Sequence, residues 1–158
     1  MYFTVLMTAV ISGCSSSITS DGIDMAGSIE SEAKVISDGK EYKCEIIHTP
    51  EQINRIKILE PKSLSGLTFS WESDNYEVSL NDLSCSFNKD FLPNTSFLSS
   101  LVEAINSINQ RESLNFESSK GGEVVFNGGC NSRIVAGKDG NIQKIEIPDK
   151  KITVEFML

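Results

Sequence analysis

The sequence predicts an α+β protein that is mainly β, with an antiparallel sheet and one main amphipathic helix. In residues 67–87, apolar and polar residues alternate in three short runs separated by Ser73-Asp74-Asn75 and Asn81-Asp82. Alternation of this kind indicates strands with one buried and one solvated face, and tight turns join them into an antiparallel meander. Residues 97–108 follow helical spacing instead, and alternation returns after Leu114.

Three strands are predicted before the meander. They run from Ile29 to Ile36, from Glu41 to Thr49 and from Ile53 to Glu60. Pro50 and Pro61 end the second and third of these strands, because proline cannot donate to a strand ladder. The alternation in the second strand places three side chains on one face, namely Tyr42, Cys44 and Ile46.

The helix is predicted to begin after Pro93-Asn94-Thr95-Ser96, where any of the three polar residues can serve as the N-cap. Its apolar stripe consists of Phe97, Leu98, Leu101, Val102, Ile105 and Ile108. The opposite, polar face consists of Ser99, Ser100, Glu103, Asn106 and Ser107. An amphipathic helix buries its stripe, so we expect it to cover one face of the sheet.

The remaining strands follow the helix. Leu114 and Phe116 begin one, and the Gly121-Gly122 turn leads to another that holds Val124 and Phe126. Asp139-Gly140 is a hairpin signal after a weaker strand. Further strands hold Ile145 and Ile147 and, after Pro148-Asp149, the alternating residues Ile152, Val154 and Phe156.

The composition fits one soluble globular domain. The chain has 158 residues, with 39% hydrophobic and 23% charged residues, which is enough to bury a core. The formal net charge is -8. A chain without a basic stripe is not expected to bind nucleic acid or to adhere to anionic lipid through basic residues.

The N-terminus has the pattern of an export signal. Residues 2–11 are almost entirely apolar, about half the ~20 residues that a membrane-spanning helix needs. The sequence Ile11-Ser12-Gly13-Cys14 resembles the lipobox of bacterial lipoproteins, although no Lys or Arg precedes it. The resemblance implies cleavage before Cys14 and a diacylglyceryl anchor on its sulfur. The alternative is a buried hydrophobic strand that ends at an ordinary cysteine.

The lipoprotein interpretation divides the chain into three parts. Residues 1–13 are the lipoprotein signal peptide, residues 14–28 are the lipidated cysteine and a flexible Ser- and Gly-rich tether, and residues 29–158 are one β-rich domain. Two acyl chains give stable membrane attachment, whereas one gives only marginal binding. The expected location is therefore the extracytoplasmic face of the cell membrane, with the protein held by its lipid anchor.

The order of elements, with several landmarks, resembles a family of uncharacterised lipoproteins found mainly in Gram-positive bacteria. The landmarks are PKSLSGLTF at 61–69, Leu92-Pro93, Asp139-Gly140 and Ile145-Glu146-Ile147-Pro148. This family is similar to the LolA-like lipoprotein-carrier fold. The resemblance implies a strongly curved antiparallel sheet, an unclosed half-barrel, packed over the helix. It also implies by analogy that a lipid or acyl chain binds in the concave face.

Four aromatic residues are the candidate ligand-binding set: Phe69, Trp71, Tyr76 and Phe87. If the curved sheet leaves a hollow, these side chains would line it and contact an apolar ligand. The alternative is that they simply pack under the helix.

Catalytic and metal chemistry have little support in the sequence. We expect the single histidine, His48, to be solvent-exposed at a strand end, without a nucleophile or orienting group. No ligand spacing predicts a metal site, and no cofactor is expected. Alternation places Cys44 and Cys85 on the buried face. With Cys130 they can form one disulfide and a free thiol, or remain three isolated thiols.

Three functions follow in order of preference, and the first two are close. The first is a membrane-anchored lipoprotein that binds a lipid or acyl chain in the concave face of the half-barrel. The second is a non-enzymatic interaction or sensor module that contacts another envelope protein. It predicts an exposed apolar patch where the first predicts a cavity. A hydrolase comes last because the sequence offers no nucleophile and base as a pair.

Overall fold

The computed structural model describes residues 27–49, 54–91, 96–110 and 114–157. The predicted signal peptide, Cys14 and most of the tether lie outside the described residues. So do Leu92-Pro93 and two of the three N-cap candidates, Asn94 and Thr95.

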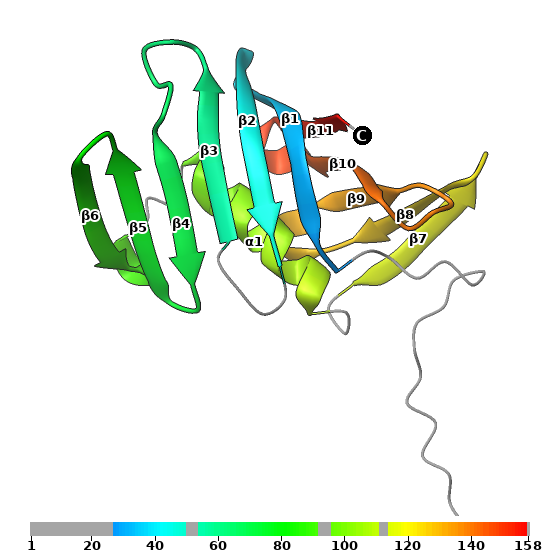
Figure 1. The fold of residues 1–158 in the computed structure, drawn as a ribbon. Coiled ribbons are helices and arrows are strands. Elements are labelled where there is room, and N and C mark those ends of the chain that lie inside the picture. Colours follow the sequence, from blue (N-terminus) through cyan, green and yellow to red (C-terminus); the bar gives the residue numbers. More distant parts are fainter. Residues whose placement is uncertain (1–26, 50–53, 92–95, 111–113, 158) are drawn as a thin grey trace, which may run out of the picture.

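In the described residues, eleven antiparallel strands form one open sheet with the order β6-β5-β4-β3-β2-β1-β11-β10-β9-β8-β7. The first six strands are β1 (Ile29–Ser37), β2 (Lys40–His48), β3 (Asn54–Glu60), β4 (Thr68–Glu72), β5 (Asn75–Leu80) and β6 (Leu83–Asn88). The last five are β7 (Asn115–Lys120), β8 (Glu123–Asn127), β9 (Arg133–Ala136), β10 (Ile142–Ile147) and β11 (Ile152–Met157). The sheet curves around the helix but does not close into a barrel: its two end strands, β6 and β7, do not pair with each other (Figure 1). The predicted fold class is confirmed.

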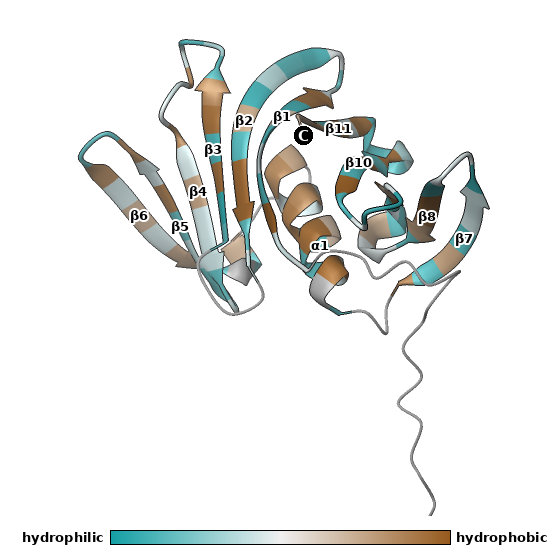
Figure 2. Ribbon diagram, turned by 45° about the vertical axis from the view of Figure 1, so that its right-hand side comes forward, coloured by the Kyte–Doolittle hydropathy of each residue, from teal (hydrophilic) through white to brown (hydrophobic). Residues whose placement is uncertain are grey.

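The helix α1 (Phe97–Asn109) lies on the concave side of the sheet (Figure 2). Ser96 is the N-cap, and its hydroxyl accepts a hydrogen bond from the backbone N–H of Leu98. The predicted stripe packs into the core, where Leu101 and Ile105 are completely buried. Among the described residues, no helix is long and apolar enough to cross a membrane.

The polar face of α1 is less exposed than expected. Ser100 and Ser107 lie on the predicted polar face, but both are only 4% exposed. A Cβ added to Gly128 would lie 2.5 Å from the Ser107 hydroxyl, so the backbone of the β8–β9 connection packs closely against the helix. The second half of the sheet therefore folds over α1, which the spacing of the helix residues could not reveal.

The convex side of β1–β3 carries cross-strand ion pairs beside the half-buried Ile36, Ile47 and Leu59. Lys43 Nζ lies 2.7 Å from Glu32 Oε2, and Lys34 Nζ lies 2.8 Å from Glu41 Oε2. Such exposed pairs contribute little to stability, but they mark this side as solvated. The core therefore lies between the concave side of the sheet and α1.

Candidate functional site

Three of the four aromatic residues predicted to bind a ligand are buried on the concave face of the sheet, which faces α1. Phe69 is 2% exposed, and Trp71 and Tyr76 are each 3% exposed. The ring centroid of Phe69 lies 6.1 Å from that of Trp71, 5.7 Å from Tyr76 and 6.3 Å from Phe87. The structure therefore brings the four residues together as one cluster, as the alternation in β4–β6 predicted.

The helix contacts this cluster directly. The indole Nε1–H of Trp71 donates a hydrogen bond to Asn106 Oδ1 across 2.9 Å. Burial raises the pKa of the Tyr76 hydroxyl, and the nearby Asp74 carboxylate adds to the rise. Phe87 is only half-buried and stacks on Tyr76 with a centroid distance of 6.1 Å. Phe69, Trp71 and Tyr76 thus contribute to the core, whereas Phe87 lies at its outer boundary.

Beyond Phe87, the same face of the sheet is open. Strand register pairs Trp71 with Tyr76 and Tyr76 with Phe87, and paired residues share a face. The face that holds these aromatics therefore continues along the β5–β6 hairpin through Val78, Leu80, Leu83, Cys85 and Phe87. We call these five residues the open hairpin face.

Exposure of the open hairpin face increases toward the turn. Leu80 is 37% exposed and Leu83 is 77% exposed, although both are large and apolar. The opposite side of the hairpin carries polar residues, including Glu77, Ser84 and Ser86. The hairpin is thus amphipathic. Val78 and Phe87 pack against the core, whereas Leu80, Leu83 and Cys85, nearer the turn, are exposed. Such a surface is typical of an interaction site.

Cys85 corrects a prediction made from alternation. It lies on the apolar face as predicted, paired with Val78, but it is exposed because α1 does not extend over β6. Cys44 is buried, and burial raises the pKa of its thiol to about 12. Cys130 is half-buried, and burial together with a hydrogen bond to Glu103 raises its pKa to about 11. All three are free thiols, which resolves the alternative left open by the sequence.

The expectation for His48 was wrong. Its side chain is completely buried, and its ring Nδ1 lies 2.6 Å from Asn54 Oδ1. Alternation explains the burial, because His48 lies two residues after the buried Ile46 on the same face of β2. The described residues contain no group of three or more His, Cys, Asp or Glu side chains placed to hold a metal ion.

Two surface hollows contain polar groups as well as aromatic rings. One, of about 270 Å3, is lined by Trp71 and Tyr76 but also by Glu72, Glu77 and Ser86. Neither Phe69 nor Phe87 lines this hollow.

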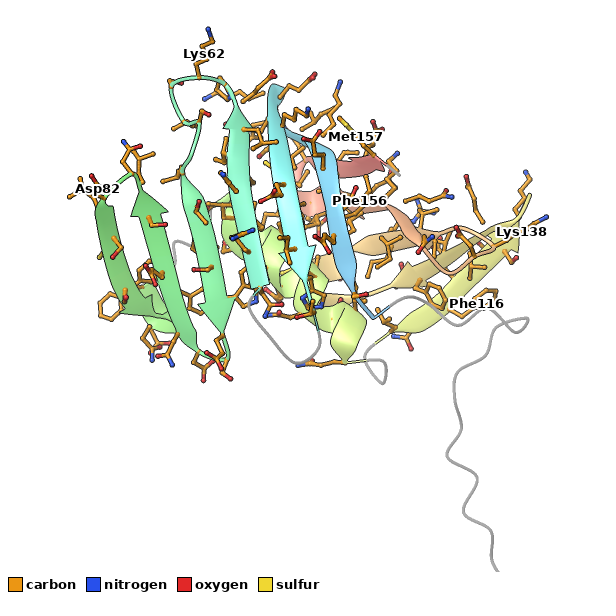
Figure 3. The ribbon with its side chains drawn as sticks, in the orientation of Figure 1. Lys62, Asp82, Phe116, Lys138, Phe156 and Met157 are labelled. Atoms are coloured by element: carbon orange, nitrogen blue, oxygen red, sulfur yellow. The ribbon has the colours of Figure 1, made fainter. Side chains whose placement is uncertain are left out.

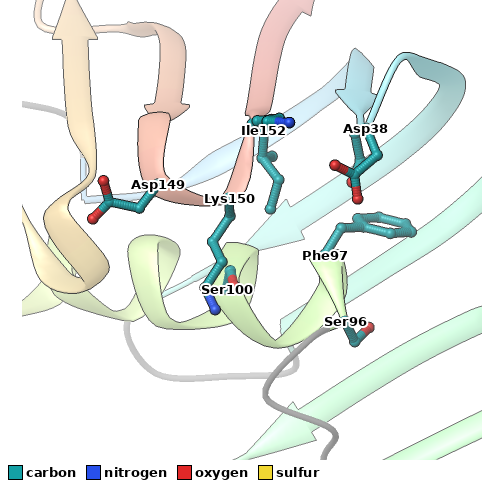
Figure 4. A pocket seen from close by; sticks show the side chains of 9 residues that line it. Asp38, Ser96, Phe97, Ser100, Asp149, Lys150 and Ile152 are labelled. Carbon is teal, nitrogen blue, oxygen red and sulfur yellow. The ribbon is translucent and has the colours of Figure 1, made fainter.

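The other hollow, of about 240 Å3, lies at the N-terminal end of α1 (Figure 4). Phe97 forms part of it and stacks on Tyr42 at 5.0 Å, while Asp38, Asp149 and Lys150 bring charges of both signs. Neither hollow is the apolar cavity that the lipid-binding hypothesis predicts.

Comparison with known proteins finds solved structures that are similar to this chain. No protein-family model matches it, and no curated protein does. The structure of the CwlD amidase from Clostridioides difficile in complex with the GerS lipoprotein contains a similar chain, with 22% identity, 82% of each chain covered and a TM-score of 0.47.

Two further structures are similar at lower identity. An uncharacterised conserved protein from Thermus thermophilus is 12% identical, with 80% of this chain and 74% of that chain covered and a TM-score of 0.45. A LolA superfamily protein from Nitrosomonas europaea is 9% identical, with 83% of each chain covered and a TM-score of 0.41.

Proposed function

We propose that this chain is a membrane-anchored lipoprotein of the extracytoplasmic face that acts as a non-enzymatic binding module for another envelope protein. The observation that carries the proposal is the open hairpin face, where Leu83 is 77% exposed on the same side as the buried Tyr76. An interaction module was predicted to show such a patch. Large exposed apolar side chains that continue from a core are typical of protein interaction surfaces.

The binding role can be tested by photo-crosslinking in the producing cell. A photoreactive residue is placed at Leu83 in one full-length variant and at Met157 in the control, because Met157 is an apolar residue 50% exposed on β11. We expect a defined protein adduct from position 83 alone, and we expect the purified partner to bind Leu83→Ser at least about tenfold more weakly than the unmodified chain. No adduct, or equal adducts from both positions, would contradict the proposal.

The anchor is tested separately. Each methylene of an inserted acyl chain contributes ~0.8 kcal/mol to membrane binding, so loss of both chains is expected to release the protein. Cys14→Ser should therefore move the full chain from the membrane fraction to the soluble fraction, whereas Cys85→Ser, the matched control, should not. Membrane association that persists in Cys14→Ser would refute the anchor without affecting the binding role.

A second candidate is the binding of a lipid or acyl chain in the concave face. One observation favours it: the cluster of Phe69, Trp71, Tyr76 and Phe87 is continuous with the open hairpin face through the half-buried Phe87. Native mass spectrometry of the full chain, with organic extraction of copurified molecules, tests this candidate. A non-covalent lipid of defined mass that is lost in Phe87→Ala would support it. A ligand-free mass that is unchanged after addition of lipid would exclude it.

A further inference from the structure

The sheet ends in two edge strands, β6 and β7, and their chemistry differs. β7 carries Glu117 and Lys120, and its pairing with β8 is irregular between Phe116 and Ser118. Charges and bulges on an edge strand are devices that prevent another strand from pairing with it. Glu117 is also held by Arg133, whose Nε lies 3.0 Å from Glu117 Oε2. The β7 edge is therefore protected against strand addition.

The β6 edge has none of these devices. The sequence of Leu83–Asn88 contains no charged residue and no proline, and β6 pairs with β5 in unbroken register from Leu80 with Leu83 to Asn75 with Asn88. Most of the strand is exposed on both faces. A regular, uncharged edge strand with an apolar face is able to accept a further strand.

The geometry of the hairpin determines which backbone N–H and C=O groups of β6 point away from β5. A two-residue loop, Asn81-Asp82, joins β5 to β6. The residues that flank such a loop exchange hydrogen bonds, and the pattern then alternates along the strand. The N–H and C=O groups of Ser84 and Ser86 accordingly point away from β5. A strand laid along β6 would bond to these two residues and place alternate side chains beside Leu83, Cys85 and Phe87.

Charge indicates which kind of strand this edge accepts. The sequence of residues 68–91 contains Glu72, Asp74, Glu77, Asp82 and Asp90 but a single basic residue, Lys89. Asp82 projects at the tip of the hairpin (Figure 3). Residues 115–157, by contrast, contain six acidic and six basic residues. Pairing of two β6 edges would bring these carboxylates together, so a second copy of this chain is disfavoured and a basic partner is favoured.

We propose that β6 is a strand-addition site for an extended segment of a partner protein in which apolar residues alternate with Lys or Arg. Its apolar side chains cover the open hairpin face, its backbone pairs with Ser84 and Ser86, and its cations lie near the carboxylates of the hairpin. This inference rests on the proposed function, because it specifies how the same surface recognises its partner.

Synthetic peptides test the inference directly. The probes are an acetylated and amidated octapeptide of alternating Lys and Val and its counterpart of alternating Glu and Val, titrated against the full chain by calorimetry. We expect the basic peptide to bind at least about tenfold more tightly than the acidic one, and we expect salt to weaken it. Hydrogen exchange at the amides of Ser84 and Ser86 should slow on binding. Equal binding of both peptides, or no binding, would overturn the inference.

Variants separate strand addition from docking in general. Ser86→Pro removes an outward N–H from β6, and Ser119→Pro makes the same change on β7 as the matched control. An edge strand tolerates proline where its N–H faces solvent. We expect Ser86→Pro and Leu83→Ser each to weaken peptide binding by at least about tenfold, and Ser119→Pro to leave it unchanged.

The remaining outcomes discriminate between the two proposals. Weakening by Leu83→Ser but not by Ser86→Pro would refute strand addition and retain the interaction surface. Weakening by neither variant would refute both proposals. A dimer in analytical ultracentrifugation that becomes monomeric in Ser86→Pro would show that a second copy occupies β6, and it would overturn the assignment of a basic partner.

Discussion

Phe69→Ala is predicted to destabilise the fold strongly, because Phe69 is a core residue and not part of an open binding surface. The side chain is 2% exposed and contacts the rings of Trp71, Tyr76 and Phe87. A buried Phe covers roughly 150–250 Å2, which at about 25 cal/mol per Å2 corresponds to about 4–6 kcal/mol as an upper bound. Measured truncations of buried Phe cost about 3–5 kcal/mol, and we expect a loss in that range.

Leu83→Ala is the matched control, because it also removes a large apolar side chain from the same side of the sheet. Leu83 is 77% exposed, so its truncation should change the free energy of unfolding by less than about 0.5 kcal/mol. Urea unfolding followed by the fluorescence of the single tryptophan, Trp71, measures both variants. If Phe69→Ala lost less than about 1 kcal/mol, close to the control, Phe69 would line a hollow and the lipid-binding candidate would gain support.

Two further predictions concern titrating groups. Cys85 should react with iodoacetamide at pH 8 in the native protein while Cys44 does not, because Cys44 is buried and burial raises the pKa of its thiol to about 12. Peptide mass spectrometry measures labelling at both sites, and equal labelling would contradict the structure. A hydrogen bond from Lys144 lowers the pKa of Glu146, so its contribution to stability is present above the unfolded pKa and lost as the pH falls through the folded pKa. Glu146→Gln should therefore flatten the acid side of the Tm profile, and an unchanged acid side would refute this reasoning.

The strands could be predicted from sequence because their signals are local. Alternation and turn residues located all the strands in their order, and the spacing of Leu101, Val102 and Ile105 located the helix. Alternation also identified which side chains share a face, including Trp71, Tyr76 and Phe87, which pair across β4–β6. These are properties of a few neighbouring residues, and the pleat of the strand determines them.

Burial was harder to predict, because it depends on what lies opposite each face. The alternation around Cys85 and Leu83 is the same as that around Cys44 and Ile46. Cys44 and Ile46 are nevertheless completely buried, whereas Cys85 and Leu83 are exposed. His48 gave the opposite error, since a polar residue at a strand end lies within the core. The position of α1 across the sheet determines these outcomes, and no local pattern encodes it.

The dimensions of α1 explain why the hairpin remains open. A helix of 13 residues is about 20 Å long and about 10 Å wide, whereas eleven strands spaced about 4.8 Å apart extend over roughly 50 Å. One helix can therefore cover only the middle of such a sheet, even when the sheet curves. Folding requires apolar residues only where α1 or the other half of the sheet covers them.

Leu83 lies outside the area that α1 covers, so the stability of this domain does not account for its apolar side chain. A serine at this position would preserve the alternation of β6, and it would change the free energy of unfolding by less than about 0.5 kcal/mol. The physical contribution of Leu83 is thus expected in a complex, where another chain removes it from water. Leu83→Ser should consequently retain the stability of the fold and lose binding, a combination that a purely structural role for the hairpin would not produce.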